Sequence, residues 1–412
     1  MRAYVEAYGC TLNFGEAREI EDLLSGSGWS IVRSSEEADL AVLATCVVVD
    51  KTERAMMKRL KELSNVPQLV VTGCMAAACR EKAESVVPDA VFVRPADLGR
   101  IAEVVRADGT AVLESSVEGS SYGIVPIATG CLGSCSYCIT KLARGVLRSR
   151  PQKMVVDTVR RMVSSGPREI RIAAQDTAAY GADIGSSLPA LVEEISAIEG
   201  DFRLRIGMMN PRSVLPQVEA VALMYRRPKV FKFLHLPLQS ASDSVLSEME
   251  RGYTVDEFKR IVSQVRSAHP TLSFSTDLIV GYPGETEDDH QQNKRAVSEL
   301  APDVVNVTKF SPRPGTKAAF SSHMVAGGEA KERSREITRI RFKVALDINM
   351  SWVGRNVNAL ATERGKDLTT LFRTDEYRQI VVPGEHPLGE FHPVKITGAT
   401  STYLRGKLGD VD

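Results

Sequence analysis

GCLGSCSYCITKLARG, residues 130–145, contains three cysteines within eight positions: Cys131, Cys135 and Cys138. Three thiolates in a C-x3-C-x2-C spacing can bind three corners of an iron–sulfur cube and leave the fourth iron without a protein ligand. A cluster that only carries electrons normally has four cysteines, so an open iron indicates a cluster that must bind something. The spacing alone leaves a zinc knuckle or a chance group of thiols as the alternative.

The composition bounds the class of protein. The chain has 412 residues, enough for two or three domains with cores of their own. Lys and Arg total 52, as do Asp and Glu, so any contact with nucleic acid must use local basic patches. The start is too polar for a signal peptide, and no apolar run approaches the roughly 20 residues of a membrane span. We therefore expect a soluble cytoplasmic protein, with no membrane partner, whose seven cysteines indicate metal or redox chemistry.

The N-terminal part of the chain alternates strand and helix patterns. Predicted strands cover residues 2–9, Ala38–Thr45 and Gln68–Gly73, and predicted helices cover Gly15–Ser25 and Lys51–Leu63. This alternation indicates a doubly wound α/β domain, in which helices cover both faces of a parallel sheet.

Three further cysteines each follow the end of a predicted strand: Cys10, Cys46 and Cys74. The carboxyl ends of parallel strands meet at one edge of a sheet, so we expect these cysteines to lie close together and form a second three-cysteine site. For each cysteine alone, a buried small hydrophobic residue is the alternative. Cys79 lies inside the predicted helix Ala76–Val86 and is interpreted as an ordinary packed thiol.

The central part of the chain alternates in the same way. The strand Tyr122–Thr129 leads directly into the cysteine stretch. The later predicted strands are Glu169–Gln175, Phe202–Met209, Phe231–Gln239, Leu272–Gly281 and Asp303–Phe310. These units predict an open (βα)6 barrel, a partial TIM barrel whose chemistry sits on the loops at the carboxyl ends of its strands.

The C-terminal part changes in character. A basic helix over Lys331–Ile348 is followed from Trp352 by short β-prone runs with Gly, Asn and Pro between them. This pattern predicts a small five-stranded barrel of the oligonucleotide-binding style, with a domain that merely caps the central barrel as the alternative. The predicted domains are residues 1–117, 118–345 and 346–412, and a run of small and polar residues over 107–121 is predicted to link the first two.

Six cysteines and three longer segments together resemble the methylthiotransferases of the radical S-adenosylmethionine superfamily. The segments are HLPLQSASDSVLSEMERGYT (His235–Thr254), STDLIVGYPGETEDD (Ser275–Asp289) and KFSPRPGTKAA (Lys309–Ala319). The six cysteines are Cys10, Cys46, Cys74, Cys131, Cys135 and Cys138. The tail resembles the TRAM domain of that family, an RNA-binding module. The resemblance covers nearly the whole chain.

Within the family, the chain looks most like the archaeal and eukaryotic subgroup. The segments that carry this likeness are CITKLARG (Cys138–Gly145), QDTAAYGADIG (Gln175–Gly185) and GMMNP (Gly207–Pro211). The subgroup converts N6-threonylcarbamoyladenosine, beside the tRNA anticodon, into its 2-methylthio derivative. The alternatives are relatives that act on isopentenyladenosine or on a ribosomal-protein aspartate, and a non-catalytic zinc-binding RNA-binding protein. The family's usual Asn-Thr-Cys is replaced by Ala44-Thr45-Cys46, which we interpret as variation in a loop.

The resemblance implies two [4Fe–4S] clusters and S-adenosylmethionine. Cys131, Cys135 and Cys138 are expected to hold the cluster whose open iron binds S-adenosylmethionine. The N-terminal trio, Cys10, Cys46 and Cys74, is expected to hold the second cluster, which carries the sulfur. Carbon 2 of adenine has no leaving group, so its C–H bond calls for radical chemistry supplied by the cofactor, and we predict no catalytic side chain beyond the cluster ligands. An electron donor and a sulfur source are expected as further partners.

Other site residues are predicted from their positions. Tyr137 is expected near the adenine of the cofactor, with a core aromatic as the alternative, and Gln175, Asp176 and Gln239 are expected to contact cofactor or substrate at the barrel mouth. A basic run leaves the cysteine stretch, and we expect it to contact phosphates of the tRNA anticodon stem-loop, although a solvated charged face is the usual explanation. This run comprises Lys141, Arg144, Arg148 and Arg150.

Overall fold

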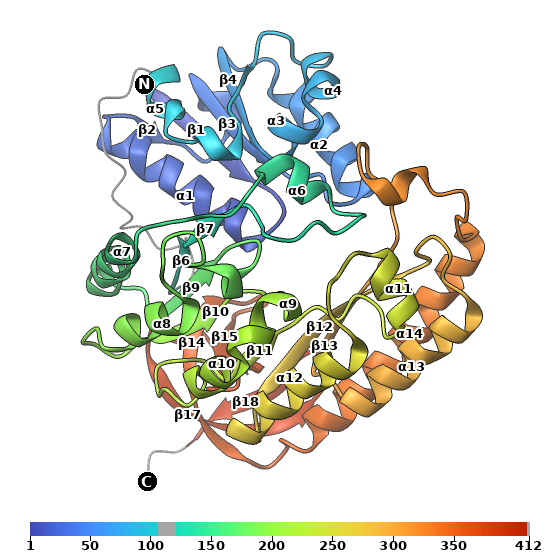
Figure 1. Cartoon of the computed structure of the whole chain (residues 1–412). Coiled ribbons are helices and arrows are strands. Elements are labelled where there is room, and N and C mark those ends of the chain that lie inside the picture. The colour runs from blue at the N-terminus through green and yellow to red at the C-terminus, as the bar shows by residue number, and fades with distance from the viewer. Residues whose placement is uncertain (106–120, 410–412) are drawn as a thin grey trace.

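The chain folds into an N-terminal α/β domain, a central open barrel and a small C-terminal barrel, shown from blue to red in Figure 1. The computed structural model describes residues 1–105 and 121–409. The predicted boundary between residues 117 and 118 lies outside these residues, as does nearly all of the predicted linker. Within the described parts of the chain, no helix combines the length and apolar character that crossing a bilayer requires.

The N-terminal sheet is parallel, with the strand order β2-β1-β3-β4-β5. Its strands are β1 (Arg2–Ala7), β2 (Ser30–Ile31), β3 (Leu40–Thr45), β4 (Gln68–Gly73) and β5 (Val91–Phe92). Every residue of β3 is buried, and successive side chains alternate between two apolar cores on the two faces of the sheet. The doubly wound α/β fold is confirmed.

Helices cover both faces of this sheet. One face carries α2 (Asp50–Leu63), α3 (Cys74–Ala78) and α4 (Arg80–Glu84), and the other carries α1 (Thr11–Gly26) and α5 (Arg100–Val104). The helix predicted over residues 76–86 is broken at Cys79, whose φ of −137° and ψ of 33° are not helical. The Cys79 side chain is buried in the core between the two short helices.

The central domain contains two three-stranded parallel sheets, β10-β9-β6 and β11-β12-β13. Their strands are β6 (Tyr122–Pro126), β9 (Glu169–Ala173), β10 (Arg203–Ile206), β11 (Phe233–His235), β12 (Ser273–Val280) and β13 (Val304–Lys309). A bridge between Leu204 and Val230, and a hydrogen bond of 3.0 Å from Met209 N to His235 O, join the two sheets into one curved wall. This wall is the open (βα)6 barrel that the sequence predicts.

Helices line the outside of the open barrel: α7 (Gln152–Ser165), α8 (Leu188–Ser196), α10 (Val218–Met224), α12 (Val255–Ala268) and α13 (Glu287–Leu300). The short helices α9 (Pro211–Val214) and α11 (Asp243–Glu248) lie at the carboxyl-end loops, where α11 contacts the cysteine stretch. The strand predicted over 122–129 divides at Ile127 into β6 and β7 (Ala128–Thr129), and β7 pairs with β8 (Arg148–Ser149). This small ribbon frames the cysteine stretch between its two strands.

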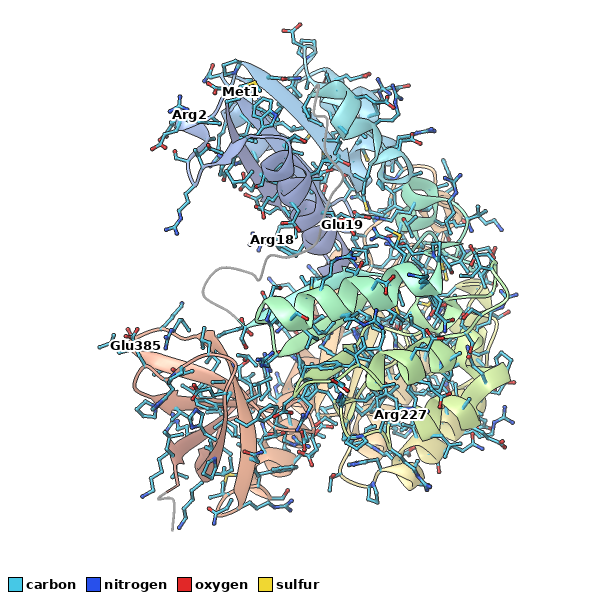
Figure 2. The ribbon with its side chains drawn as sticks, turned by 90° about the vertical axis from the view of Figure 1, so that its left-hand side faces the viewer. Met1, Arg2, Arg18, Glu19, Arg227 and Glu385 are labelled. Atoms are coloured by element: carbon cyan, nitrogen blue, oxygen red, sulfur yellow. The ribbon has the colours of Figure 1, made fainter. Side chains whose placement is uncertain are left out.

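Each edge of the open barrel is covered by a helix. Helix α1 of the N-terminal domain packs on β6, where a Cβ added at Gly15 would lie 2.8 Å from Ile124 Cγ2. Helix α14 (Gly327–Met350) packs on β13 at the opposite edge. The close approach at Gly15 means that the N-terminal domain is docked on the barrel and acts as part of its wall. Figure 2 shows Glu19 on the side of α1 that faces the central domain.

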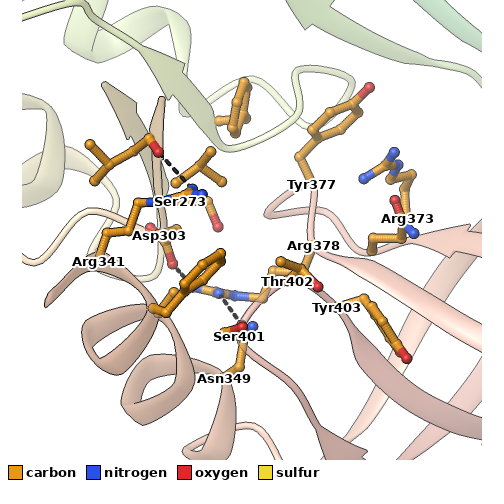
Figure 3. Close-up of a pocket in the computed structure, with 16 residues that line it drawn as sticks. Ser273, Asp303, Arg341, Asn349, Arg373, Tyr377, Arg378, Ser401, Thr402 and Tyr403 are labelled. Carbon is orange, nitrogen blue, oxygen red and sulfur yellow. Dashed lines mark hydrogen bonds and ion pairs between the residues drawn. The ribbon is translucent and has the colours of Figure 1, made fainter. Parts of the chain in front are cut away.

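The C-terminal barrel is closed, with the strand order β14-β15-β16-β18-β17. Its strands are β14 (Asn356–Arg364), β15 (Thr369–Arg373), β16 (Gln379–Pro383), β17 (Phe391–Ala399) and β18 (Leu404–Leu408). Residues of this barrel and of the central domain together line a cavity of about 290 Å³. Figure 3 shows the bond from Arg378 to Asp303 that joins the two domains there. Phe233, Ser273 and Val304 line this cavity from the amino ends of their strands, so it lies at the opposite end of the barrel from the cysteine stretch.

Candidate metal centre

The N-terminal cysteines follow the carboxyl ends of three neighbouring strands. Cys10 caps the start of α1 after β1, Cys46 follows β3 directly, and Cys74 is the first residue of α3 after β4. Because β1, β3 and β4 are adjacent and parallel, the three loops lie side by side at one edge of the sheet. The topology therefore brings Cys10, Cys46 and Cys74 to one place.

Two Gly-Cys pairs allow these loops to approach each other. Gly9 has φ +105°, and a Cβ added there would lie 2.8 Å from Cys46 Sγ. Gly73 has φ +81°, and a Cβ there would lie only 2.3 Å from the carbonyl oxygen of Thr45. A larger residue at either position would combine a strained backbone with a clash. Glycine before Cys10 and before Cys74 is thus what lets both loops pack against the Cys46 loop.

Two buried polar side chains fasten the same loops together. Asn13 Nδ2 donates to Tyr8 O at 2.7 Å and to Thr45 O at 2.9 Å, which joins the ends of β1 and β3. The Thr45 hydroxyl donates to Thr72 O and accepts from Met75 N at 3.1 Å, which joins the ends of β3 and β4. Neither role was predicted from the sequence. The one hint there is that a polar residue stands near each of two cysteines: Asn13 three residues after Cys10, and Thr45 directly before Cys46.

The N-terminal thiols influence each other electrostatically. Burial raises the pKa of Cys74 to about 12; the nearby Cys10 and Cys46 add to this rise, while the Arg144 guanidinium opposes it. Burial also raises the pKa of Cys46. Metal ligation by thiols releases protons, so a raised pKa makes metal binding at these cysteines more dependent on pH. Across the described residues, no three His, Cys, Asp or Glu side chains gather around one point as ligands of a single metal ion.

The three cysteines of the second trio lie in the short loop between β7 and α6 (Ile139–Arg144). Gly133 N donates to Cys131 Sγ at 3.2 Å, and a Cβ added at Gly133 would lie 3.4 Å from that sulfur and 3.7 Å from Cys135 Sγ. Cys138 N donates to Cys135 O at 3.1 Å, and Cys138 caps helix α6. Burial raises the pKa of Cys131 to about 11, against the effect of the Gly133 N–H. The loop backbone thus gathers the sulfurs and offers them an N–H donor.

Arg251 is a site residue that the sequence analysis missed. Its side chain is buried, with 6% exposure of the residue, and its Nη1 donates to Cys135 Sγ at 3.2 Å. Its Nε donates to the Tyr253 hydroxyl at 3.0 Å, and longer bonds of 3.5 Å run from the guanidinium to Tyr137, Asn210 and Pro237. Arg251 therefore presents a positive charge and an N–H donor to the Cys135 sulfur. Arg251 lies inside the segment His235–Thr254, but nothing in the local pattern singles it out.

Gln239 and Gln175 differ in the hydrogen bonding of their side-chain oxygens. Gln239 has φ +70°, and its Oε1 is buried without a hydrogen-bond partner in the described structure. Such an acceptor in a barrel-mouth loop fits a ligand that brings a donor. Gln175 Oε1 accepts from Gly130 N at 2.7 Å and so supports the start of the cysteine stretch.

Asp176 is already occupied by protein donors. Its Oδ1 accepts from Asn210 N at 2.9 Å and from Ala178 N at 3.2 Å, and its Oδ2 accepts from the Ser213 hydroxyl at 2.6 Å. Burial raises the pKa of this carboxyl, and these bonds oppose the rise. In this arrangement Asp176 ties together the ends of β9 and β10, and its predicted contact with a cofactor stays a prediction.

Tyr137 lies in the loop of the second trio, between Cys135 and Cys138. Its ring meets Tyr282 edge to face, with centroids 6.3 Å apart, and packs on the small apolar cluster around Val245 and Met249. A cavity of about 90 Å³ is lined by Tyr137 and Cys138 together with Val48, two residues beyond Cys46. The loop after Cys46 and the loop that carries Cys138 therefore border a common cavity.

The four predicted RNA contacts differ in how exposed they are. The prediction for Arg144 is wrong, because its side chain is fully buried and a phosphate cannot reach it. Arg150 is half-buried and paired with Glu19, and Lys141 donates to Cys131 O. Arg148 is exposed and lines a cleft of about 620 Å³ between α1 and α7. The contiguous basic run is therefore not a contiguous basic surface.

Family models match three parts of the chain. Residues 2–93 match the model described as uncharacterized protein family UPF0004, residues 125–295 match the radical SAM superfamily, and residues 350–408 match the TRAM domain. The matched segments follow the N-terminal, central and C-terminal bodies of the structure.

Curated relatives match nearly the whole length. A protein of Pyrococcus horikoshii named probable threonylcarbamoyladenosine tRNA methylthiotransferase is 38% identical, over 99% of each chain. A protein of Dictyoglomus thermophilum named tRNA-2-methylthio-N(6)-dimethylallyladenosine synthase is 31% identical, over 98% of each chain. Among solved structures, the radical S-adenosylmethionine methyltransferase TsrM of Kitasatospora setae has a TM-score of 0.58 at 14% identity, over 77% of this chain and 75% of that one. This last likeness concerns the fold alone.

Proposed function

Because the chain belongs to the tRNA methylthiotransferases of the radical S-adenosylmethionine superfamily, we propose that it converts N6-threonylcarbamoyladenosine next to the tRNA anticodon into its 2-methylthio derivative. The relative named for threonylcarbamoyladenosine shares 38% of its residues with this chain, and the relative named for dimethylallyladenosine shares 31%. The greater likeness supports the threonylcarbamoyl substrate. The chain is an enzyme, and the alternative of a non-catalytic zinc-binding protein is wrong.

One observation carries the proposal: three cysteines follow three strands of the N-terminal sheet, three more lie in the loop after the first strand of the barrel, and the Cys46 and Cys138 loops line one cavity. In this proposal Cys131, Cys135 and Cys138 hold one [4Fe–4S] cluster, and Cys10, Cys46 and Cys74 hold a second. When bound, the clusters and S-adenosylmethionine supply the one-electron chemistry that removes hydrogen from an unactivated carbon and replaces it with sulfur. The Gly133 N–H on Cys131 Sγ and the buried Arg251 on Cys135 Sγ supply donors that fit such a group.

The chain's own residues bind and orient the reactants. Arg251 would stabilise negative charge on the group held by Cys135, because its guanidinium donates to the Cys135 sulfur. Gln239 offers a buried acceptor, which suits a donor such as the ammonium group of S-adenosylmethionine. Tyr137 lines the cavity beside Cys138 and would limit the access of water there.

The tRNA substrate approaches the outside of this cavity. Arg148, in the cleft between α1 and α7, is the candidate for contact with an anticodon-stem phosphate. Lys141 lies nearer to the cysteine stretch, where its ammonium group already donates to Cys131 O. An unpaired base of the anticodon loop can be turned out of its stack toward the cavity at modest cost. An electron donor and a sulfur source complete the reaction in the cytoplasm, where the tRNA is used.

The product of the reaction tests this function. The reconstituted enzyme is incubated with tRNA, S-adenosylmethionine, sulfide and a reductant, and the nucleosides are analysed by mass spectrometry. We expect 2-methylthio-N6-threonylcarbamoyladenosine. If only the isopentenyl analogue is modified, the subgroup assignment is wrong. A parallel incubation with ribosomal protein tests the aspartate alternative.

The substitution Arg148→Gln is expected to weaken tRNA binding without changing which tRNAs are bound. A phosphate contact carries no sequence information, so the loss is uniform and the slope of log K against log salt falls by about one. The measurement is a filter-binding or fluorescence titration at several salt concentrations. Arg2→Gln is the matched control, because Arg2 is 53% exposed on its side chain at the far edge of the N-terminal domain (Figure 2). Equal effects of both substitutions would show that Arg148 makes no specific contact.

A further inference from the structure

Helix α6 connects the two cysteine trios physically. It begins after Cys138, which caps it, and ends six residues later at Arg144. At about 1.5 Å per residue, this helix spans about 9 Å. Its buried residues Ile139 and Ala143 pack in the N-terminal core together with Cys74 and Met75. The helix that leaves one trio is thus embedded beside the helix that starts with a cysteine of the other.

The last residue of α6 is a fully buried arginine. The Arg144 guanidinium donates from Nη2 to Glu16 Oε2 at 2.8 Å and to Asn13 Oδ1 at 2.5 Å, and Nη1 bonds the other oxygen of Glu16. Its Nε has no hydrogen-bond partner in the described structure. Interior cations are tolerated only where anionic and polar partners compensate them, so this position is built for a guanidinium.

Arg144 shares a hydrogen-bond partner, Asn13, with the loops that carry Cys10 and Cys46. Asn13, which accepts from the guanidinium, also donates to the ends of β1 and β3 beside Cys10 and Cys46. Helix α6, which ends at Arg144, packs against α3, whose first residue is Cys74. This packing and the Asn13 bonds bring the guanidinium next to the loops that carry the three cysteines.

Other arginine–glutamate pairs join the same two domains but lie elsewhere. Arg150 pairs with Glu19, one turn along α1 from Glu16, and Arg313 pairs with Glu53 on α2. The side chains of these two arginines bond Glu19 and Glu53, whereas Arg144 also bonds Asn13 beside the N-terminal trio. Arg144 therefore differs from them by its link to the cysteine loops.

We propose that Arg144 is a positioning residue for the group held by Cys10, Cys46 and Cys74, and that its charge raises the reduction potential of that group while Glu16 limits the rise. This inference rests on the proposed function, which places an iron–sulfur cluster there. Reduction adds a negative charge to a cluster, and a nearby guanidinium in a water-poor interior stabilises the reduced form. Charge and hydrogen bonding around the sulfurs are known determinants of cluster potential.

The test uses the full chain with Cys131→Ser, Cys135→Ser and Cys138→Ser, so that only the N-terminal cluster remains. Its midpoint potential and electron paramagnetic resonance spectrum are recorded anaerobically for this parent and for Arg144→Gln, Arg144→Lys, Glu16→Gln and Arg150→Gln. We expect a more negative potential for Arg144→Gln and a more positive one for Glu16→Gln. Arg144→Lys keeps the charge and should lie near the parent, and Arg150→Gln should match it.

A shift common to Arg144→Gln and Arg144→Lys would assign the effect to lost packing and overturn the proposal, as would a fully iron-loaded Arg144→Gln chain with the potential of the parent. Should Arg144→Gln fail to fold, Glu16→Gln decides alone: an unchanged or more negative potential contradicts the proposal. A parent that binds no iron would reject the N-terminal cluster itself, and this inference with it. Iron content separates that failure from the others before any potential is measured.

Discussion

Cys131→Ser is expected to abolish the cleavage of S-adenosylmethionine, whereas Cys10→Ser is expected to spare cleavage and stop the transfer of sulfur to tRNA. The reason is that the two cysteines belong to different trios: Cys131 lies in the loop after β7 of the central domain, and Cys10 caps α1 of the N-terminal domain. In both cases the lost activity should fall to background, because one missing thiolate leaves a cluster with two protein ligands. Formation of 5′-deoxyadenosine and of the methylthio nucleoside is measured in the same reaction.

Cys79→Ser is the matched control for this pair. Cys79 is also a buried thiol of the N-terminal domain, but it lies at the break between α3 and α4 and not at the end of a strand. Both activities should survive its replacement. Loss of cleavage in Cys10→Ser would mean that the trios do not act separately, and survival of sulfur transfer in that variant would remove Cys10 from the ligand set.

Glu53→Ala is expected to lower the free energy of unfolding by about 3–5 kcal/mol, because it leaves a buried arginine without its counter-ion. Glu53 on α2 and Arg313 in the loop after β13 form an ion pair in which both side chains are 4% exposed. Lys82 bonds the other oxygen of the same carboxylate. Chemical denaturation followed by circular dichroism measures the loss, and limited proteolysis shows whether the N-terminal domain detaches.

The control for this prediction is Asp50→Ala on the same helix. Asp50 pairs with Arg54 on the surface, where an ion pair of this spacing contributes only about 0.3–0.5 kcal/mol. If both variants lose the same small amount of stability, the Glu53–Arg313 pair does not hold the domains together.

The pH dependence of the wild-type chain provides a second check. Burial would raise the pKa of the Glu53 carboxyl, but hydrogen bonds and charges from Lys82 and Arg313 hold it below its ordinary value of 4.5. The folded chain therefore binds that proton less readily than the unfolded chain does. The stabilisation is present above the ordinary pKa and is lost as the pH falls through the lowered one. The difference between wild type and Glu53→Ala should shrink in that acid range.

The architecture was predictable because hydrophobic pattern and chain order are local properties. The run Leu40–Thr45 is apolar throughout, which is typical of a strand covered on both faces, and the structure buries all of it. The rule that parallel strands end at one edge then predicts where Cys10, Cys46 and Cys74 lie relative to each other, and the observed strand order agrees.

The roles of single polar residues were less predictable. Arg144 looks like part of a solvated basic run, but its partner Glu16 lies 128 residues away in sequence, so no local pattern shows that it is buried. The same holds for Arg251, whose sulfur partner lies 116 residues away. Asp176 is the opposite case. Its position in the sequence predicts contact with a cofactor or substrate, but in the folded chain its carboxylate accepts hydrogen bonds from Asn210 and Ser213.

The fold class and the family follow from the order of residues along the chain, since both depend on periodicity and on cysteine spacing. Which charges lie near the cysteine trios, which face solvent and which join the domains can be seen only in the folded molecule. Burial and ion pairing depend on distances in space between segments far apart in sequence. The stretch of residues 130–145 illustrates both: its cysteines can be interpreted from their spacing, whereas the place of its last arginine, inside the neighbouring domain, can be seen only in the folded chain.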